Sequence, residues 1–153
     1  MISPELLRRY PFFSELESRQ LDEIAMIAEE KLFENGEKLF ENGQSAEFLY
    51  FLREGIIELY YFPPNGGSTA GNKGILVDEV VPGEPFSISA LIEPYVLTSS
   101  AWTQKPSSVI QIDAQALRAL FEDDQKMAYV LTSHAAQAIM ERLHATRIQL
   151  AVV

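Results

Sequence analysis

The sequence predicts a mainly β domain, a sandwich or barrel, with helical segments before and after it. Short apolar runs separated by turn residues recur at intervals of about ten residues through the middle of the chain. Helical periodicity appears near the N-terminus and again over the last third. The 153 residues suit one domain over 1–153, with N-terminal helices at 1–30, a β-roll at 31–112 and C-terminal helices at 113–153.

Composition and charge exclude several classes of function. The chain has no cysteine, which removes disulfides, thiolate metal sites and cysteine nucleophiles. It has no signal-peptide-like start and no apolar run of about 18 residues, so we expect a cytoplasmic protein without a membrane partner. The net charge of −10 disfavours binding to phosphate backbones, and we interpret Arg8-Arg9 as part of a solvated helix face.

An amphipathic helix is predicted near the N-terminus, with acidic residues on its outer side. Its apolar positions at helical spacing are Leu16, Leu21, Ile24, Ala25 and Ala28. From Lys31 the periodicity changes to that of β-strands. The expected strands are the apolar runs at 31–33, 48–52, 56–62, 75–81, 99–103 and 107–112.

The pentapeptide Leu-Phe-Glu-Asn-Gly occurs twice within residues 32–43. Asn-Gly is the strongest turn-forming dipeptide, so each copy predicts a strand end followed by a turn, at Gly36 and at Gly43. These turns would be two consecutive corners of one roll. The Pro-, Gly- and Asn-rich stretch at 63–74 predicts a hairpin tip, because a phosphate-binding loop would end in Gly-Lys-Ser/Thr.

Two helices are predicted after the strands. Asp113 can cap a short helix over 114–122, and a long helix is expected from about Gln125 to the C-terminus. Such a helix exceeds about 35 Å in length, more than a compact β-domain covers. We therefore predict a homodimer that buries a stripe of this helix. The expected dimer residues are Leu131, Ala135, Ala138, Ile139, Leu143 and Leu150.

Residues for catalysis or metal binding are sparse in this sequence. The two histidines, His134 and His144, are ten residues apart on the long helix, too far for one metal ion. No Gly-x-Ser-x-Gly motif is present, and the acidic pairs suit capping or exposed positions. We expect no metal site, no catalytic residue and no enzymatic activity.

Three motifs, in order, resemble the cyclic-nucleotide-binding domain. They are the segment Gly36 to Gly43, the segment Phe48 to Leu59 with its L-x-x-G-x-I pattern, and Pro82-Gly83-Glu84. The order of elements is similar to the sensor domain of the catabolite-activator and fumarate-nitrate-reductase (CRP/FNR) regulator superfamily. This resemblance implies a double-stranded β-helix (jelly roll) with a long C-terminal helix.

The resemblance also locates a degenerate phosphate-binding cassette. Family members that bind cyclic AMP or cyclic GMP carry F-G-E there, with an arginine before the next strand. In this chain Ser87 replaces the glycine, Ile88 replaces the glutamate, and Thr98 or Ser99 occupies the arginine position. Each lost charge-assisted hydrogen bond costs on the order of 1.5–3 kcal/mol. Losing both weakens a micromolar site by roughly two to four decades.

We therefore expect no cofactor and no cyclic nucleotide bound in the usual mode, unless an arginine such as Arg53 or Arg147 substitutes. Hydroxyls in an apolar hollow, with Tyr61 and Trp102 nearby, suit another small ligand, although Ile88 filling the hollow is an alternative. The candidate ligand-binding residues are Phe86, Ser87, Ile88, Ser89, Ala90, Leu91, Thr98, Ser99, Ser100 and Thr146. Thr146 matches a family position near the nucleobase, or it is only a small residue in the dimer contact.

The resemblance implies a dimeric sensor that relays ligand occupancy through its long helix. Superfamily transcription factors continue into a winged helix-turn-helix, whereas this sequence stops at Val153. We expect a stand-alone ligand-sensing module with a small-molecule effector or a protein partner and no direct nucleic-acid binding. Two alternatives stay open, namely the effector domain of a longer CRP/FNR-type regulator and a partner-docking dimer without a pocket.

Overall fold

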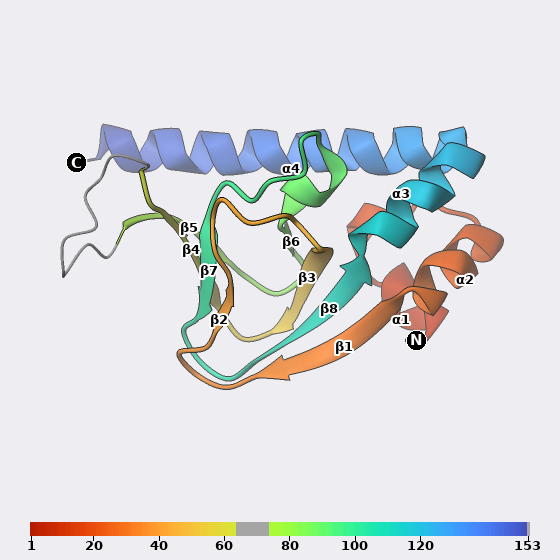
Figure 1. Cartoon of the computed structure of the whole chain (residues 1–153), viewed down its shortest axis with the longest axis horizontal. Coiled ribbons are helices and arrows are strands. Elements are labelled where there is room, and N and C mark those ends of the chain that lie inside the picture. Colours follow the sequence, from red (N-terminus) through yellow and green to blue (C-terminus); the bar gives the residue numbers. More distant parts are fainter. Residues whose placement is uncertain (64–73, 153) are drawn as a thin grey trace.

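Two four-stranded antiparallel sheets form the middle of the molecule in the computed structural model, which describes residues 1–63 and 74–152 (Figure 1). The first sheet has the order β1-β8-β3-β6 and the second β2-β7-β4-β5. Their strands are β1 (Ala28–Phe33), β2 (Lys38–Phe40), β3 (Phe48–Glu54), β4 (Ile57–Tyr61), β5 (Ile75–Val80), β6 (Pro85–Phe86), β7 (Ser100–Thr103) and β8 (Ser107–Asp113). The prediction of a mainly β jelly roll is confirmed.

Helices enclose one end of the roll and run along its top (Figure 1). They are α1 (Pro4–Arg8), the 3₁₀ turn η1 (Pro11–Phe13), α2 (Ser18–Met26), the 3₁₀ turn η2 (Ile88–Leu91), α3 (Ala114–Asp123) and α4 (Gln125–Ala151). Asp113 caps α3 through its side chain, as predicted. The 27-residue α4 spans about 40 Å and crosses the whole roll.

The end of the N-terminal amphipathic helix differs from the sequence prediction. Helix α2 ends at Met26, so Ala28 belongs to β1 instead of continuing the amphipathic helix. Ala28 is fully buried and pairs with Ile112 of β8, so pairing within the sheet determines its conformation. The predicted hairpin tip at 63–74 lies outside the described residues, except at its two ends.

The core has two aromatic clusters, one on each face of the first sheet. On the outer face, Phe12 and Phe13 pack on Phe51 with ring centroids 5.0 Å away in each case. Inside the roll, the Tyr50 ring stacks on Phe86 at 5.0 Å and on Phe40 at 5.8 Å. The alternation of β3 side chains between the two faces produces this division. Of this inner cluster, Phe40 also lines the candidate site.

Both copies of the repeated pentapeptide end in turns. Gly36 and Gly43 follow β1 and β2, with φ angles of +78° and +93°. Residues with a side chain rarely adopt such φ angles, which explains why each copy ends in glycine. The amides of Gly36 and Gly43 donate to the carbonyls of Thr103 and Leu97, at 3.1 and 2.8 Å. The two copies are therefore successive corners of the roll, as the sequence predicted.

Candidate functional site

The cassette segment begins with a strained residue. Ser87, directly after β6, has a φ of +61° and a ψ of +41°, the left-handed region that favours glycine. Its hydroxyl donates to the carbonyl of Phe48 at 2.7 Å, a bond that fixes this turn against β3. After Ser87 the chain forms η2, and Arg118 of α3 donates to the Ala90 carbonyl at 2.7 Å. The cassette is therefore held from two sides.

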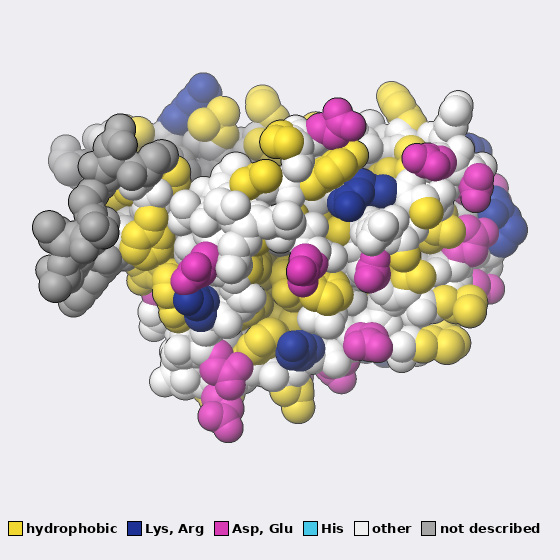
Figure 2. Space-filling model, in the orientation of Figure 1, with side chains coloured by type: hydrophobic (Ala, Val, Ile, Leu, Met, Phe, Trp, Pro, Cys, Tyr) yellow, Lys and Arg dark blue, Asp and Glu magenta, His cyan; other side chains and the backbone are white. Residues whose placement is uncertain are grey.

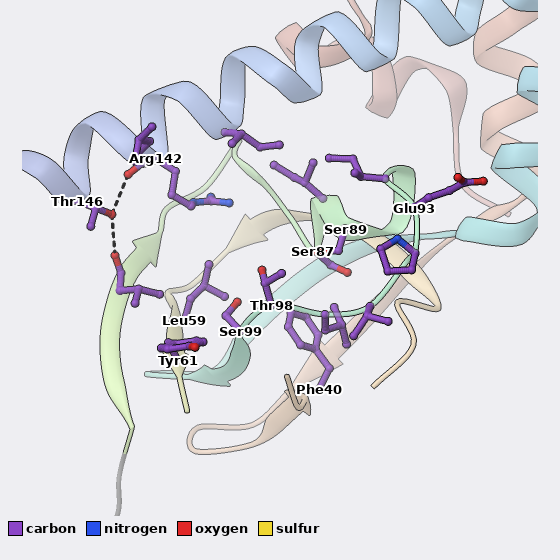
Figure 3. A pocket seen from close by; sticks show the side chains of 18 residues that line it. Phe40, Leu59, Tyr61, Ser87, Ser89, Glu93, Thr98, Ser99, Arg142 and Thr146 are labelled. Atoms are coloured by element: carbon purple, nitrogen blue, oxygen red, sulfur yellow. Dashed lines mark hydrogen bonds between the residues drawn. The ribbon is translucent and has the colours of Figure 1, made fainter. Parts of the chain in front are cut away.

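A cavity of about 510 Å³ lies between the cassette, strands β4 and β5, and α4 (Figure 3). We call it the cassette cavity. Its volume falls within the range of small-molecule sites. It is lined by Phe40, Leu59, Tyr61, Val77, Ser87, Ile88, Ser89, Ile92, Glu93, Pro94, Val96, Leu97, Thr98, Ser99, Ile139, Arg142, Leu143 and Thr146. Ile88 forms part of the wall and leaves the cavity open.

Six of the ten predicted ligand-binding residues line this cavity. They are Ser87, Ile88, Ser89, Thr98, Ser99 and Thr146. Among the described residues, the side-chain hydroxyls of Ser89, Thr98 and Ser99 have no hydrogen-bond partner. Figure 3 shows these serines and Thr98 on the side of the cavity that faces α4. The cavity therefore offers free hydroxyls to a ligand.

The other four predicted residues do not line the cassette cavity. Phe86 is fully buried under Tyr50, and Ala90 is fully buried within η2. Leu91 packs against the core. Ser100 accepts a hydrogen bond from the Asn42 amide at 2.9 Å and donates to the Asn42 side chain at 3.0 Å. Sheet alternation turns Ser100 away from Ser99, which a prediction by proximity in sequence overlooked.

Arg142 is the main residue that the sequence analysis missed. It reaches from α4 into the cassette cavity, where Nε donates to Asp78 of β5 at 2.5 Å and Nη2 donates to the Pro85 carbonyl at 3.0 Å (Figure 3). Thr146, one turn later, donates to the Arg142 carbonyl at 3.0 Å. Arg142 lies four residues before Thr146, so both residues are on the same face of α4. This spacing is the signal in the sequence that could have identified Arg142.

The two arginines considered from sequence lie elsewhere. Arg53 pairs with Glu30 of β1 and does not line the cassette cavity. Arg147 is exposed and also does not line it. In the described part of the chain, Arg142 is therefore the only cationic side chain at this cavity. Glu93 is the only acidic side chain in the same lining.

The residues of the predicted dimer stripe on α4 differ in their exposure. Leu131 is fully buried and Ala135 is 2% exposed, because both pack into the core of their own chain, and Ala138 packs partly against it. The exposed apolar line consists of Tyr129, Ala136, Leu143 and Leu150, which we call the seam. These residues are spaced by seven and form one narrow stripe. Ile139 and Leu143, two of the predicted dimer residues, also line the cavity.

Within residues 1–63 and 74–152, no group of three or more potential ligand side chains could hold a metal ion. His134 makes a 2.7 Å hydrogen bond with the carbonyl of Phe12 and lies 3.5 Å from Glu15, so it joins α4 to the N-terminal segment. None of the described helices is both long and apolar enough to cross a membrane.

A jelly roll with a cavity between the cassette turn and a long C-terminal helix is the architecture that the resemblance in sequence implied. Residues 30–124 match the family model of the cyclic nucleotide-binding domain. The chain belongs to this family.

Solved structures give the same fold. A Geobacter metallireducens protein assigned as cyclic nucleotide-binding is 41% identical, with 94% of this chain and 100% of that chain covered and a TM-score of 0.82. The sensor domain of the transcriptional regulator DNR from Pseudomonas aeruginosa is 18% identical, with 92% and 90% covered and a TM-score of 0.71. The resemblance stated from sequence is confirmed. No curated protein matches significantly.

The regulatory domain of Toxoplasma gondii PKA, solved with cAMP, is 15% identical to this chain. The match covers 88% of this chain and 48% of that one, with a TM-score of 0.70. At this identity the likeness shows the fold alone. The identities of the cassette residues therefore decide what this cavity accepts.

Proposed function

We propose that this domain is a dimeric ligand-sensing module that binds an uncharged small molecule in the cassette cavity and carries out no chemistry. The observation that carries the proposal is the pairing of Arg142 with Asp78. Because this carboxylate already neutralises the guanidinium, the cavity has no free positive charge for a phosphate among its described residues. An uncharged ligand needs no such charge.

The lining of the cavity supports this ligand class. Leu59, Val77 and Ile139 offer apolar contact, and the unpaired hydroxyls of Ser89 and Thr98 offer hydrogen bonds. A cyclic nucleotide would have to separate Arg142 from Asp78 or enter without a counter-charge. Either process costs on the order of 1.5–3 kcal/mol, the contribution of one charge-assisted hydrogen bond.

The helix α4 supports the sensing part of the proposal. It supplies Ile139, Arg142 and Thr146 to the cavity and presents the seam on an adjacent face. Leu143 belongs to both surfaces. A ligand that changes the position of α4 therefore changes the surface that a second copy would contact.

A second candidate is the effector domain of a CRP/FNR-type transcription regulator. The fold shared with the DNR sensor domain, in a match that covers 90% of that chain, favours this candidate. The open cassette cavity supports either ligand-binding role over a partner-docking dimer without a pocket.

Thermal melts test the proposed ligand class. We expect adenosine and other uncharged nucleosides or aromatic amides to raise the melting midpoint in a concentration-dependent way, and cyclic AMP and cyclic GMP to leave it unchanged at micromolar concentration. Ile139→Gln, which changes the cavity wall, should reduce any shift. A large shift with micromolar cyclic AMP would contradict the proposal, and so would the absence of a shift across a broad set of neutral compounds.

A further inference from the structure

The pair formed by Arg142 and Asp78 joins three elements beside the cassette cavity. Nε of Arg142 donates to Asp78 of β5, and Nη2 donates to the carbonyl of Pro85 in β6 at 3.0 Å. Figure 3 shows the Arg142 side chain extending from α4 toward the cassette turn. The side chains of the pair are 22% and 17% exposed, so solvent screens their interaction less than it screens a surface ion pair. Asp78 therefore compensates the charge of Arg142.

Asp78 reaches Arg142 without lining the cavity itself. It lies opposite Leu59 in the register of β4 and β5, and Leu59 lines the cavity. Residues directly opposite each other on neighbouring strands point to the same face of a sheet, so Asp78 lies on the inner face of the roll. Asp78 is not among the described residues of the lining. It therefore acts on a ligand through the guanidinium of Arg142.

Arg142 keeps hydrogen-bond donors that remain available to a ligand. A guanidinium has five N–H groups. Arg142 uses Nε and Nη2, whereas Nη1 makes no hydrogen bond with the described residues. These donors suit a carbonyl group while the Asp78 carboxylate compensates the charge. Without that carboxylate they would suit an anion better, because charge-assisted hydrogen bonds are about twice as strong as neutral ones.

The charges around the cavity give Arg142 a deciding role. The whole chain has a net charge of −10. On the face drawn in Figure 2, basic side chains lie singly or beside acidic ones. Glu93 is the acidic side chain in the described lining, where Arg142 is the cationic one. Attraction of an anion into this cavity therefore depends on whether the charge of Arg142 is compensated.

We propose that Asp78 determines the charge selectivity of the cassette cavity. Its carboxylate compensates the cationic group of the described lining, so the cavity rejects phosphates and carboxylates and accepts uncharged ligands. Without the charge of Asp78, the same cavity becomes an anion site in which Arg142 is the binding group. This inference rests on the proposed function, because it names the residue that sets the ligand class of that cavity.

Calorimetric titration of Asp78→Asn with cyclic AMP and with adenosine tests this role. Asparagine is the matched replacement, because its carbonyl can still accept from Nε of Arg142. We expect Asp78→Asn to bind cyclic AMP about tenfold more tightly than the parent does, since one charge-assisted hydrogen bond to phosphate is gained. The affinity for adenosine, which has no phosphate, should change by about twofold or less. The gain for cyclic AMP should shrink as the salt concentration rises.

Three further variants show whether the gain acts through Arg142. Asp78→Glu keeps the charge and should keep the weak cyclic AMP binding of the parent. Arg142→Gln combined with Asp78→Asn should abolish the gain. Glu93→Gln removes a negative charge from the lining but leaves the pair intact, so it should raise the affinity for cyclic AMP about threefold at most. Melting midpoints show whether each variant is folded.

Equal affinities of folded Asp78→Asn and the parent for cyclic AMP, including no measurable binding by either, would overturn the inference. A gain that persists in the double variant would also overturn it. The proposed function fails in a different way, through the response of the parent itself to micromolar cyclic AMP or to neutral compounds. The inference depends instead on the ratio of affinities between variant and parent.

Discussion

Gly55 allows the end of β3 to approach Ser107 of β8 closely. It follows β3 with a φ of +106°, and a Cβ built there would lie 2.0 Å from Oγ of Ser107. Gly43 has a similar angle, of +93°, but nothing lies within 4 Å of its Cβ position. A substitution at Gly43 would therefore introduce backbone strain alone, whereas one at Gly55 would introduce both strain and a steric clash.

We expect Gly55→Ala to lower the free energy of unfolding by about 3 kcal/mol, from strain and clash together. Gly43→Ala should lower it by about 1 kcal/mol, from strain alone. Urea denaturation followed by circular dichroism measures both. Equal losses in the two variants would show that the contact with Ser107 is relieved at little cost.

Thr98 allows the cassette's missing charge to be restored. It is exposed, lines the cassette cavity and is, with Ser99, one of the two candidates for the arginine position. Thr98→Arg should raise the affinity for cyclic AMP about tenfold, since one charge-assisted hydrogen bond to phosphate is gained. Thr98→Gln, similar in polarity but uncharged, should have little effect. Calorimetry compares them, and equal affinities would show that the phosphate does not reach this position.

The sequence identified the cassette segment but not Arg142, the only cationic side chain in the described lining of the cassette cavity. Ser87, Ile88 and Thr98 were found because they occupy motif positions within one short segment of the chain, residues 87–98. Arg142 lies 64 residues from Asp78, its partner, and only the packing of α4 over β5 brings them together. Periodicity along one segment carries no information about such a contact.

The helix α4 shows the limit of sequence periodicity at the scale of one element. Its existence and start were predicted correctly, because capping and the absence of Gly and Pro are local properties. Its apolar residues form two stripes, one on the core and one on the seam, and the prediction combined them. Leu131 belongs to the first and Leu143 to the second. Which stripe faces inward depends on η1 and η2, which α4 contacts.

Two leucines on α4 test this division. Leu131→Ala should lower the free energy of unfolding by about 3 kcal/mol, because it leaves a cavity in the core. Leu143→Ala, at a residue that is 42% exposed, should lower it by about 1 kcal/mol. Chemical denaturation at low protein concentration measures the protomer alone. A larger loss for Leu143→Ala would contradict the assignment of the stripes.

The start of α4 depends on one carboxylate. Asp124 accepts from the Met127 amide at 3.0 Å and from the Gln20 side chain at 2.9 Å, and Arg19 lies 3.6 Å away. The Gln20 hydrogen bond, then the Met127 amide and Arg19, lower the pKa of Asp124 below its ordinary value. A lowered pKa stabilises the fold above the ordinary value of 3.8 and loses this contribution as the pH falls through the folded value.

Asp124→Asn should therefore be less stable than the parent at neutral pH and lose less stability on acidification. Melting midpoints between pH 7 and pH 3 would show the two curves converging at the acid end. Asp123→Asn, one residue earlier and exposed, serves as the matched control. Parallel curves for Asp124→Asn and the parent would contradict the role of this cap.

At the scale of the whole molecule, the seam is the feature that predicts assembly. Tyr129 is 75% exposed and Leu150 is 71% exposed along one line of α4. We expect Ala136→Glu to dissociate the proposed dimer, because it places a charge in the middle of this line. Gln137→Glu adds the same charge on another side of the helix and should leave the dimer intact. Light scattering distinguishes them, and an unchanged mass for both variants would exclude the seam.

Leu143 lies in the wall of the cassette cavity and on the seam, so it would connect the two proposed equilibria, ligand binding and dimerisation. Thermodynamic linkage is reciprocal: if the ligand changes the dimerisation constant by some factor, dimerisation changes the ligand affinity by the same factor. Half-saturation by an effector should then shift with the amount of protein present. The response to the effector would then depend on the concentration of the protein as well as on that of the effector. Ligand titrations at two protein concentrations would reveal this shift in half-saturation.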